Sequence, residues 1–364
     1  MSSWLKILIF LFTPIFLTSS ITVDDPGQDE VYQPAGTYLV EQFRLKDVIL
    51  AGESHRIREH AEFIAGMIPL LHKNGIHLLF SEFADCADSA LIDSLICGDV
   101  YDESLARYIS WKNMWDWGYK EYADVYYAAW KVNQNLWPGE EPFRIIGIEQ
   151  EVPVNVEPEL WWARVIGRYS LEKNKKALVW CGLHHSFSNY YHPYYINDSI
   201  QGFVSTRVGN LLYRRYPSRV MTVVLHAPLK AAIGAEVGYV LPANGTIDSV
   251  VYSLPEGDRA IGFNTNETWL GNCSLESTFY AAGYVNFTLK NLCQGYIVVK
   301  PVCGLHMVTA IPGFINTSNL TETRKMAGMG DLSPEAFNDT IRQWLEAESP
   351  FLFDVQKRSC FPPP

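Results

Sequence analysis

Short apolar runs alternate with longer amphipathic segments through the first two-thirds of the chain. Near-continuous apolar runs, which are typical of strands buried on both faces of a parallel sheet, lie at residues 48–51, 77–83, 143–148, 177–182 and 219–226. Segments with apolar residues at helical spacing lie between them, at residues 56–73, 89–96, 101–112, 119–136, 159–172 and 199–216. This alternation predicts an α/β fold, with a mostly parallel sheet and helices on both of its faces.

The pattern changes after residue 227. Short β-like pieces at 239–241, 249–253 and 296–300 are separated by turns that contain Gly, Asn and Pro. The most apolar stretch, residues 295–315, contains Lys, His and two prolines, so we expect a pair of core strands there and not a membrane span. Ser333, followed by Pro and Glu, predicts the start of a last helix with serine as its cap.

These patterns divide the chain into four parts. We expect a signal peptide at residues 1–20, a leader at 21–40, a single α/β domain at 41–350 and a tail at 351–364. Within the domain, residues 229–330 are expected to form a β-rich, irregular extension that packs on the same core.

The N-terminal residues have the features of a secretory signal. Lys6 precedes an apolar segment at residues 7–17, and the small residues 18–20 suit a cleavage site. The apolar segment is short for a helix that spans a bilayer, which needs about 20 residues. We therefore expect a secreted or extracytoplasmic protein. The alternative is membrane attachment through an uncleaved N-terminal segment.

Cysteines and glycosylation motifs agree with export. Seven cysteines leave one unpaired if the others form disulfides; Cys86/Cys97 and Cys273/Cys293 are candidate local pairs, and Cys181 is the expected odd one. Eight Asn-x-Ser/Thr sequons predict a glycosylated exterior, with a merely polar, Thr-rich loop composition as the alternative. The sequons begin at Asn197, Asn244, Asn266, Asn272, Asn286, Asn316, Asn319 and Asn338.

Composition and charge narrow the range of partners. Hydrophobic residues make up 48% of the chain and charged residues 19%, which is typical of a globular protein. The formal net charge is -11, and the chain has no run of Lys or Arg. Because phosphate binding needs a basic face, we expect no nucleic-acid partner.

Two of the predicted strands end in the same short signature, Gly-x-x-His. The first motif runs from Gly52 through Glu53 to His55, and the second runs from Gly182 to His185. Ligands bind at the carboxyl ends of the strands in an open parallel sheet, and glycine lets the chain turn sharply off a strand. We therefore expect the two histidines to face a common pocket.

Carboxylates near two further strand ends extend this candidate site. Glu82 lies inside an apolar strand, where a carboxylate is costly unless it is paired or functional. Its burial would raise its pKa, whereas a neighbouring imidazolium or metal would lower it. Glu149 ends the third predicted strand and is a secondary candidate.

Two imidazoles and these carboxylates suit two kinds of chemistry. One is a divalent metal site with His55, His185 and Glu82 as ligands and an open position for water. The other is metal-free hydrolysis, in which histidine activates water and glutamate orients it. The alternative without chemistry is that each histidine caps a neighbouring backbone group.

The loop that follows the second motif, residues 186–195, carries five aromatic residues. Tyr190, Tyr191 and His192 in this loop, with His184 in the motif itself, are candidates to line the pocket and stack on a planar ligand. An aromatic-rich surface loop is the alternative.

In this order and strand context, the motifs resemble the superfamily that joins ChaN-type haem-binding lipoproteins, Tiki/TraB proteins and erythromycin esterases. The ChaN-like pattern matches best: an apolar strand with Gly-Glu-x-His, a helix, a strand with Glu, a Trp/Tyr-rich region such as residues 115–130, and the second motif. The resemblance covers residues 48–228, with a weaker similarity at 291–298. It implies that the pocket positions are filled by Glu53, His55, Glu82 and His185.

The chain departs from that pattern in three ways. Erythromycin esterases have one more residue between the motif Glu and His. The role of their catalytic base is therefore poorly assigned to His55 by this resemblance. No lipobox cysteine follows the apolar N-terminal segment, unlike in typical ChaN lipoproteins. The haem-ligating residue of that group has no identifiable counterpart among the many tyrosines.

Three functions follow from these observations. We expect an exported hydrolase of ester or peptide bonds, which acts on a small-molecule or peptide substrate with or without a divalent metal. The first alternative, implied by the resemblance, is a non-enzymatic protein that binds haem or a metalloporphyrin for iron uptake, with residues 186–195 supplying stacking or an axial ligand. The second alternative is a glycosylated surface interaction module.

Overall fold

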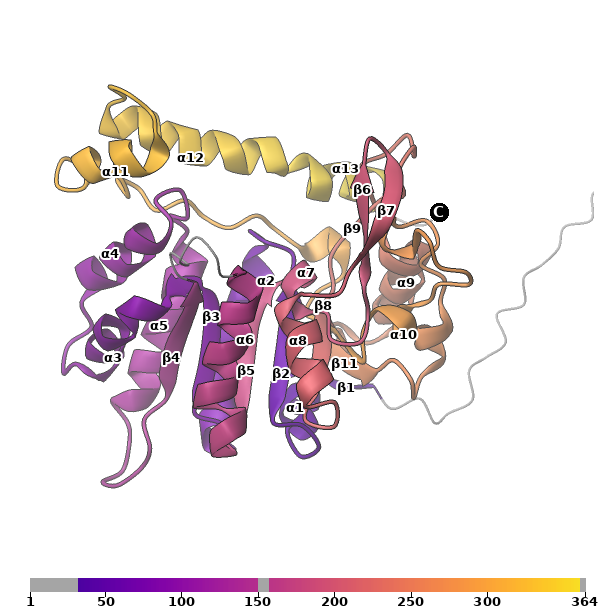
Figure 1. Ribbon diagram of the computed structural model, residues 1–364, viewed down its shortest axis with the longest axis horizontal. Coiled ribbons are helices and arrows are strands. Elements are labelled where there is room, and N and C mark those ends of the chain that lie inside the picture. Colours follow the sequence, from indigo (N-terminus) through magenta and orange to yellow (C-terminus); the bar gives the residue numbers. More distant parts are fainter. Residues whose placement is uncertain (1–31, 150–156, 361–364) are drawn as a thin grey trace, which may run out of the picture. The chain divides into compact units, whose positions relative to one another are not determined.

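An eight-stranded sheet runs through the described part of the chain, residues 32–149 and 157–360 of a computed structural model (Figure 1). The predicted signal peptide and residues 21–31 of the predicted leader lie outside the described residues. The strand order is β1 (Gln33–Pro34), β11 (Ile261–Asn264), β12 (Gly295–Val298), β8 (Val220–Leu225), β2 (Val48–Glu53), β5 (Ala177–Gly182), β3 (Leu78–Asp85) and β4 (Arg144–Glu149).

The strands from β12 to β4 are parallel to one another, and β11 and β1 add antiparallel pairs at one edge. The predicted mostly parallel sheet is therefore confirmed. β5 lies between β2 and β3 although it follows both in sequence. The two motif strands, β2 and β5, are thus direct neighbours, and their carboxyl ends lie at the same edge of the sheet.

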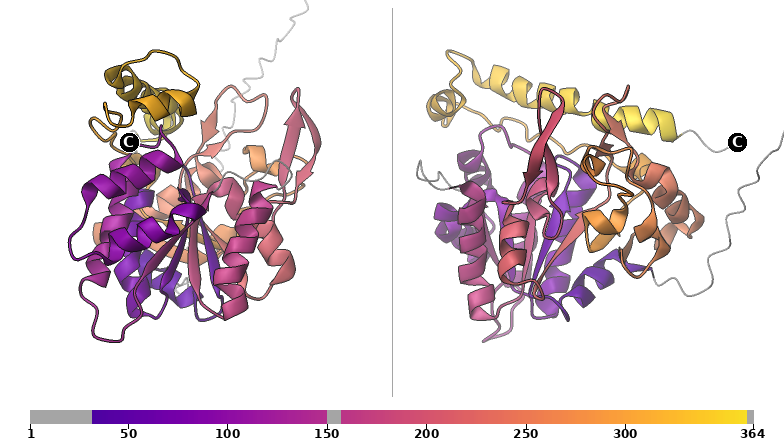
Figure 2. Two further views of the ribbon diagram at one scale, coloured as in Figure 1. Left: turned by 60° about the vertical axis from the view of Figure 1, so that its left-hand side comes forward. Right: turned by 45° about the vertical axis from the view of Figure 1, so that its right-hand side comes forward.

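Helices cover both faces of the sheet, as predicted (Figures 1 and 2). Ile49 and Ala51 of β2 join one apolar cluster, whereas Val48 and Leu50 join another, because successive side chains of a strand point to opposite faces. The first cluster includes residues of α1 (Ala35–Gln42), α2 (Arg58–Lys73), α3 (Ser89–Cys97), α4 (Glu103–Asn113) and α5 (Lys120–Asn133). The second includes residues of α6 (Pro158–Tyr169) and α8 (Val208–Arg215). β1 and most of α1 fall within the segment predicted as a leader.

Residues 199–216, predicted as one helix, form a strand and a shorter helix instead. β6 (His192–Ile196) and β7 (Ser199–Val204) pair as an antiparallel hairpin that projects from the helices and the sheet (Figure 2). Asn197 and Asp198 adopt positive φ values at its turn. This tight turn, made by residues that tolerate positive φ, overrides the helical spacing of the nearby apolar residues.

The region after residue 227 contains less β structure than its sequence predicts. β9 (Leu229–Lys230) pairs with β10 (Tyr239–Val240), but the predicted strand at 249–253 belongs to helix α9 (Thr246–Ser253). Ile247 and Val251, four residues apart, are buried on one face of that helix. Residues 295–315 supply β12, a short 3₁₀ helix at Val302–Gly304 and isolated bridges at Met307 and Ala310, and do not form the expected strand pair.

Helices α11 (Leu320–Ala327), α12 (Pro334–Glu348) and α13 (Pro350–Ser359) follow. Ser333 caps α12 by accepting a hydrogen bond from the N–H of Ala336, which confirms the predicted helix start. α12 and α13 lie across the carboxyl edge of the sheet (Figure 1). Most of the predicted tail, residues 351–364, belongs to α13 and is helical. In the described ranges, no helix is both long and apolar enough to cross a membrane.

A disulfide joins Cys303 to Cys360. Cys86 and Cys97, expected to pair locally, are free thiols, and Cys181 is a free thiol buried in β5. The thiol of Cys293 is buried beside the carbonyl of Leu289 and does not form the expected local bond. The Cα atoms of the bonded pair lie 5.6 Å apart although 57 residues separate them in sequence, because the fold and not the sequence spacing decides which cysteines meet.

Candidate functional site

The two Gly-x-x-His motifs pack against each other at the carboxyl edge of the sheet. A Cβ atom on Gly52 would lie 2.3 Å from Oγ of Ser186, which follows the second motif. A Cβ atom on Gly182 would lie 2.6 Å from Cε1 of His55 in the first motif. Each glycine therefore makes room for the other motif, and a side chain at either position would push the motifs apart.

Glu53 is buried at the end of β2, and three polar groups hold its carboxylate. Tyr122 Oη donates to Oε1 at 2.5 Å, and Trp180 Nε1 donates to Oε2 at 2.6 Å. Nδ1 of His55 lies 3.0 Å from Oε1. These donors replace the water that the carboxylate loses when it is buried. When Nδ1 of His55 donates to Glu53, the Nε2 atom of the ring is left to accept a proton.

Glu82, on β3, lies between the two motif histidines. Its Oε2 atom accepts a hydrogen bond from the N–H of Gly182 at 2.6 Å, and its Oε1 atom lies 3.5 Å from Nε2 of His185. Glu82 is nearly buried. The carboxylate inside this apolar strand is therefore paired with a backbone donor and an imidazole, which are the partners that its burial requires.

His185, in the short helix α7 (Leu183–Ser186), pairs with a second carboxylate. Its Nδ1 atom lies 2.7 Å from Oε1 of Glu159, at the start of α6. Arg207 Nη1 and the N–H of Val208 also donate to Glu159, both at 2.7 Å. Sequence reasoning missed Glu159 and Arg207, because no spacing or motif links either residue to His185.

The carboxylates determine how the two motif histidines titrate. Burial alone would lower the pKa of His55, but its hydrogen bond with Glu53 and the charge of Glu82 raise that pKa above the usual value. Burial likewise opposes a charge on His185, and Glu159 and Glu82 together raise its pKa. Burial would raise the pKa of Glu159, but His185 and Arg207 hold it below its usual value. Both imidazoles therefore bind a proton more readily than a free imidazole does.

A cavity of about 880 Å³ opens beside the motif histidines. This size lies within the range of small-molecule sites, roughly 300–1,000 Å³. Both motifs and the C-terminal helices contribute to its lining, which includes Glu53, Ser54, His55, Gly182, Leu183, His184, His185, Pro228, Lys230, Tyr239, Tyr280, Glu348, Phe351, Lys357 and Arg358. The structure therefore brings His55 and His185 to one cavity, with Glu53 in its lining and Glu82 directly behind Gly182.

The secondary candidates lie in different places. His184 lines the cavity, with Nε2 3.0 Å from Oη of Tyr280, and burial lowers its pKa to about 3. His192 stacks on His184 with ring centroids 4.9 Å apart and accepts a hydrogen bond from Arg207. Tyr190 is buried and donates to the carbonyl of Tyr280.

Tyr191 and Glu149 lie farther from the motifs. Tyr191 is 38% exposed and its carbonyl accepts a hydrogen bond from Tyr284. Glu149 ends the edge strand β4 in register with Asp85. Of the loop and strand-end candidates, His184 thus lies closest to the motif histidines.

The residues predicted as metal ligands do not form a metal site. Nδ1 of His55 and Nδ1 of His185 each face a carboxylate, and Nε2 of His185 faces Glu82. A catalytic zinc site uses three protein ligands around one point. Within residues 32–149 and 157–360, no group of three or more His, Cys, Asp or Glu side chains has that arrangement. The geometry favours direct pairing of imidazole with carboxylate over ligation of a metal by His55, His185 and Glu82.

A family model matches the part of the chain that holds the first motif and Glu82. Residues 39–137 match the family described as Haem-binding uptake, Tiki superfamily, ChaN. The predicted resemblance to this superfamily is confirmed. The matched segment holds the first motif, Glu82 and Tyr122, and it ends before the second motif with His185.

Three solved structures are similar to parts of the chain. The type III effector HopBA1 has 14% identity over 60% of this chain and 97% of its own, with a TM-score of 0.37. A protein from Bacillus cereus has 11% identity over 69% of this chain and 88% of its own, with a TM-score of 0.41. RRSP, a MARTX toxin effector domain from Vibrio vulnificus, has 14% identity over 52% and 36%, with a TM-score of 0.32. No curated protein matches the chain.

Proposed function

We propose that this protein hydrolyses an ester or peptide bond with the paired histidines and glutamates of the two motifs. One observation carries the proposal: two imidazole–carboxylate pairs, Glu53–His55 and Glu159–His185, meet around Glu82 at the lining of one cavity. Perturbed titratable groups that converge in a cavity are typical of acid–base catalysis.

In this proposal, His55 is the general base. Glu53 accepts its Nδ1–H, so Nε2 takes a proton from water while the water oxygen attacks the carbonyl carbon of the substrate. The C–O or C–N bond then breaks, and the imidazolium of His55 returns the proton to the leaving group. His185, held as a cation by Glu159 and Glu82, stabilises the negative charge that develops on the carbonyl oxygen. In these steps, His55 transfers the proton and His185 stabilises the developing charge.

A panel of p-nitrophenyl esters and fluorogenic peptides tests this proposal. His55→Ala and His185→Ala are each expected to lower kcat/KM about a hundred-fold. His72→Ala is the matched control, because His72 stacks on His77 and bonds to the carbonyl of Glu141, remote from the motifs. Full activity in both motif variants, or no turnover by the wild-type protein, would contradict the proposal.

Haem binding is the second candidate, and the family match over residues 39–137 favours it. The aromatic side of the cavity, with Tyr239, Tyr280 and Phe351, would cover a planar ligand, and His184 would offer a neutral imidazole. Titration with haemin tests this candidate: a shifted Soret band that weakens in His184→Ala supports it, and a flat titration removes it.

We also infer that the protein is exported, with residues 1–20 as a cleaved signal peptide. The Cys303–Cys360 disulfide supports this proposal, because disulfides persist in oxidising compartments. The N-terminal sequence of the mature protein, recovered outside the cytoplasm, is the test. The remaining alternative is a surface interaction module without catalytic or ligand-binding chemistry. Such a module would still bind its protein partner in a pull-down after His55→Ala or His185→Ala.

A further inference from the structure

The last two helices supply one side of the cavity. We call this side the C-terminal wall, and it consists of Ala347, Glu348, Phe351, Asp354, Lys357 and Arg358. The same cavity is lined by His55 and His185. A molecule bound next to the motif histidines therefore lies within reach of side chains that come from the far end of the chain.

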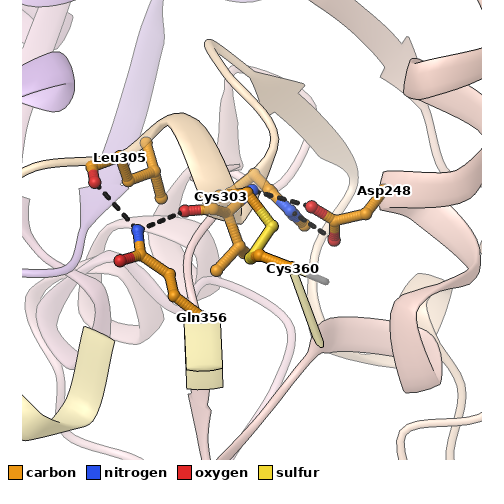
Figure 3. The surroundings of a disulfide bond; sticks show 7 residues. Asp248, Cys303, Leu305, Gln356 and Cys360 are labelled. Carbon is orange, nitrogen blue, oxygen red and sulfur yellow. Dashed lines mark hydrogen bonds and ion pairs between the residues drawn. A yellow bond between two sulfur atoms is a disulfide. The ribbon is translucent and has the colours of Figure 1, made fainter. Parts of the chain in front are cut away.

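The C-terminal wall is fixed to the rest of the domain by several contacts. Figure 3 shows Gln356 and Cys360 reaching the segment that holds Cys303 and Leu305. Gln356 Nε2 donates to the carbonyls of Val302 and Leu305 at 2.8 and 2.9 Å. At the other end, Glu348 forms an ion pair with Arg56, directly after the first motif.

The segment that receives these contacts is itself tied to the buried interior. The N–H of Val302 donates to Oδ1 of Asp248 at 2.7 Å, and Oδ2 of Asp248 lies 3.0 Å from Nε2 of the buried His226 (Figure 3 shows Asp248). Nδ1 of His226 lies 2.9 Å from Oη of Tyr296 in β12. The disulfide therefore connects α13 to a network that begins in the sheet.

Three aromatic side chains line this part of the cavity and offer an apolar binding surface. Phe351 of the wall packs on Tyr239, with ring centroids 5.3 Å apart, and Tyr280 lines the same cavity. On this side the cavity is also lined by three basic and three acidic residues, Lys230, Lys357, Arg358, Glu236, Glu348 and Asp354. Because the charges roughly balance, the surface favours a neutral apolar group over an ion.

We propose that the C-terminal wall selects the substrate: Phe351, with Tyr239 and Tyr280, binds a neutral apolar or aromatic group next to the scissile bond, and the disulfide holds Phe351 in place. The part of this proposal that concerns substrate selection rests on the proposed hydrolase function. The binding surface itself can be tested without turnover.

Turnover of p-nitrophenyl acetate and p-nitrophenyl hexanoate tests the selection. The wild-type protein is expected to prefer the hexanoate. Phe351→Ala should lower kcat/KM for the hexanoate roughly ten-fold and leave the acetate nearly unchanged. Phe353→Ala is the matched control, since Phe353 lies on the same helix and is 43% exposed. An equal loss on both esters, or no loss on either, would overturn the proposal.

Binding of the neutral fluorophore N-phenyl-1-naphthylamine separates this proposal from the hydrolase proposal. The wild-type protein and His55→Ala are expected to bind the fluorophore equally, whereas Phe351→Ala should bind it roughly ten-fold more weakly. If no ester is hydrolysed but this binding pattern is found, the hydrolase proposal fails and the apolar binding surface stands. Equal binding by Phe351→Ala overturns the surface.

The role of the disulfide has its own variant. Cys303→Ser/Cys360→Ser should lose fluorophore affinity as Phe351→Ala does, and the amides of α13 should exchange hydrogen faster. Cys86→Ser/Cys97→Ser is the control, because both of those thiols are free. Unchanged affinity and unchanged exchange in the disulfide variant would overturn the positioning role.

Discussion

The N–H of Gly182 donates a hydrogen bond to Oε2 of Glu82 at 2.6 Å, so the glycine of the second motif fixes a carboxylate next to both motif histidines. Glu82 is the group through which the two imidazole–carboxylate pairs affect each other. Its charge contributes to the raised pKa values of both His55 and His185. A change of charge at Glu82 is therefore expected to act on both histidines.

Glu82→Gln is expected to lower the pKa values of His55 and His185 together, because the variant removes a negative charge that favours both imidazolium forms. NMR titration of the two ring signals is the measurement. If the protein is a hydrolase, the acidic limb of kcat/KM should move to lower pH as well. Glu103→Gln, at an exposed position of α4, should change neither titration, and a shift of one histidine alone would contradict the coupling.

Gly182→Ala is expected to displace the ring of His55, because the new Cβ atom would lie 2.6 Å from Cε1 and 2.7 Å from Nε2. The activity of the proposed hydrolase should fall at least as far as in His55→Ala, while far-UV circular dichroism stays that of the folded protein. Gly66→Ala is the control. That glycine lies inside α2 with nothing within 4 Å of the added atom, so alanine should stabilise the protein by up to about 1 kcal/mol.

Tyr122→Phe and Trp180→Phe each remove a donor from the buried carboxylate of Glu53. Each is expected to lower the free energy of unfolding by about 1–3 kcal/mol, since a buried acceptor is left with one partner fewer. Urea denaturation measures this change. The double variant should show strong non-additivity because both donors bind one carboxylate, and simple addition of the two losses would contradict a shared partner.

The His185–Glu159 pair should contribute most to stability in mildly acidic solution. The pKa of His185 is raised from 6.5, so its contribution is fully present below that pH and is lost as the pH rises through the folded-state pKa. The pKa of Glu159 is lowered from 4.5, so its contribution is present above 4.5 and is lost as the pH falls through its folded-state pKa. His185→Asn should therefore destabilise the protein more at pH 5.5 than at pH 8.5, as measured by urea unfolding. An equal loss at both pH values would contradict the pairing.

The sequons should differ in occupancy when the protein is made in a glycosylating host. Asn197 is exposed at the turn of the β6–β7 hairpin. Nδ2 of Asn338 donates to the carbonyls of Ile315 and Pro334, both at 2.7 Å, and a glycan on that nitrogen would remove one of these bonds. Peptide mass spectrometry after deglycosylation is expected to find Asn197 modified and Asn338 unmodified; occupied Asn338 in folded protein would contradict this expectation.

Periodicity predicts much of this fold because the central strands are buried on both faces. The runs that became β2, β3, β4, β5 and β8 are mostly apolar, and the apolar residues of most segments between them recur at helical spacing. The meeting of His55 with His185 follows from the same logic, since parallel strands end at one edge. The hairpin at residues 192–204 could not be predicted in this way, because a two-residue turn decides it and the flanking pattern does not.

The partners of the site are less accessible to sequence reasoning. Glu159 lies 26 residues before His185 and Arg207 lies 48 residues after Glu159, and neither follows a motif. Phe351 falls in what the sequence presents as a tail. These residues meet the motifs through tertiary packing of α6, α8 and α13, which local spacing does not encode.

The position of β5 between β2 and β3 determines the order in which the strands of the sheet can pair. During synthesis, β2 and β3 emerge first but must stay apart, because each pairs in the finished sheet with β5, which starts at residue 177 and follows both of them by about a hundred residues or more. An early pairing of β2 with β3 would have to be undone before β5 could enter. Such long-range insertion slows folding. Both motif histidines are therefore present only in a nascent chain that has passed residue 185, and the cavity beside them gains its C-terminal wall only after residues 347–358 have been made.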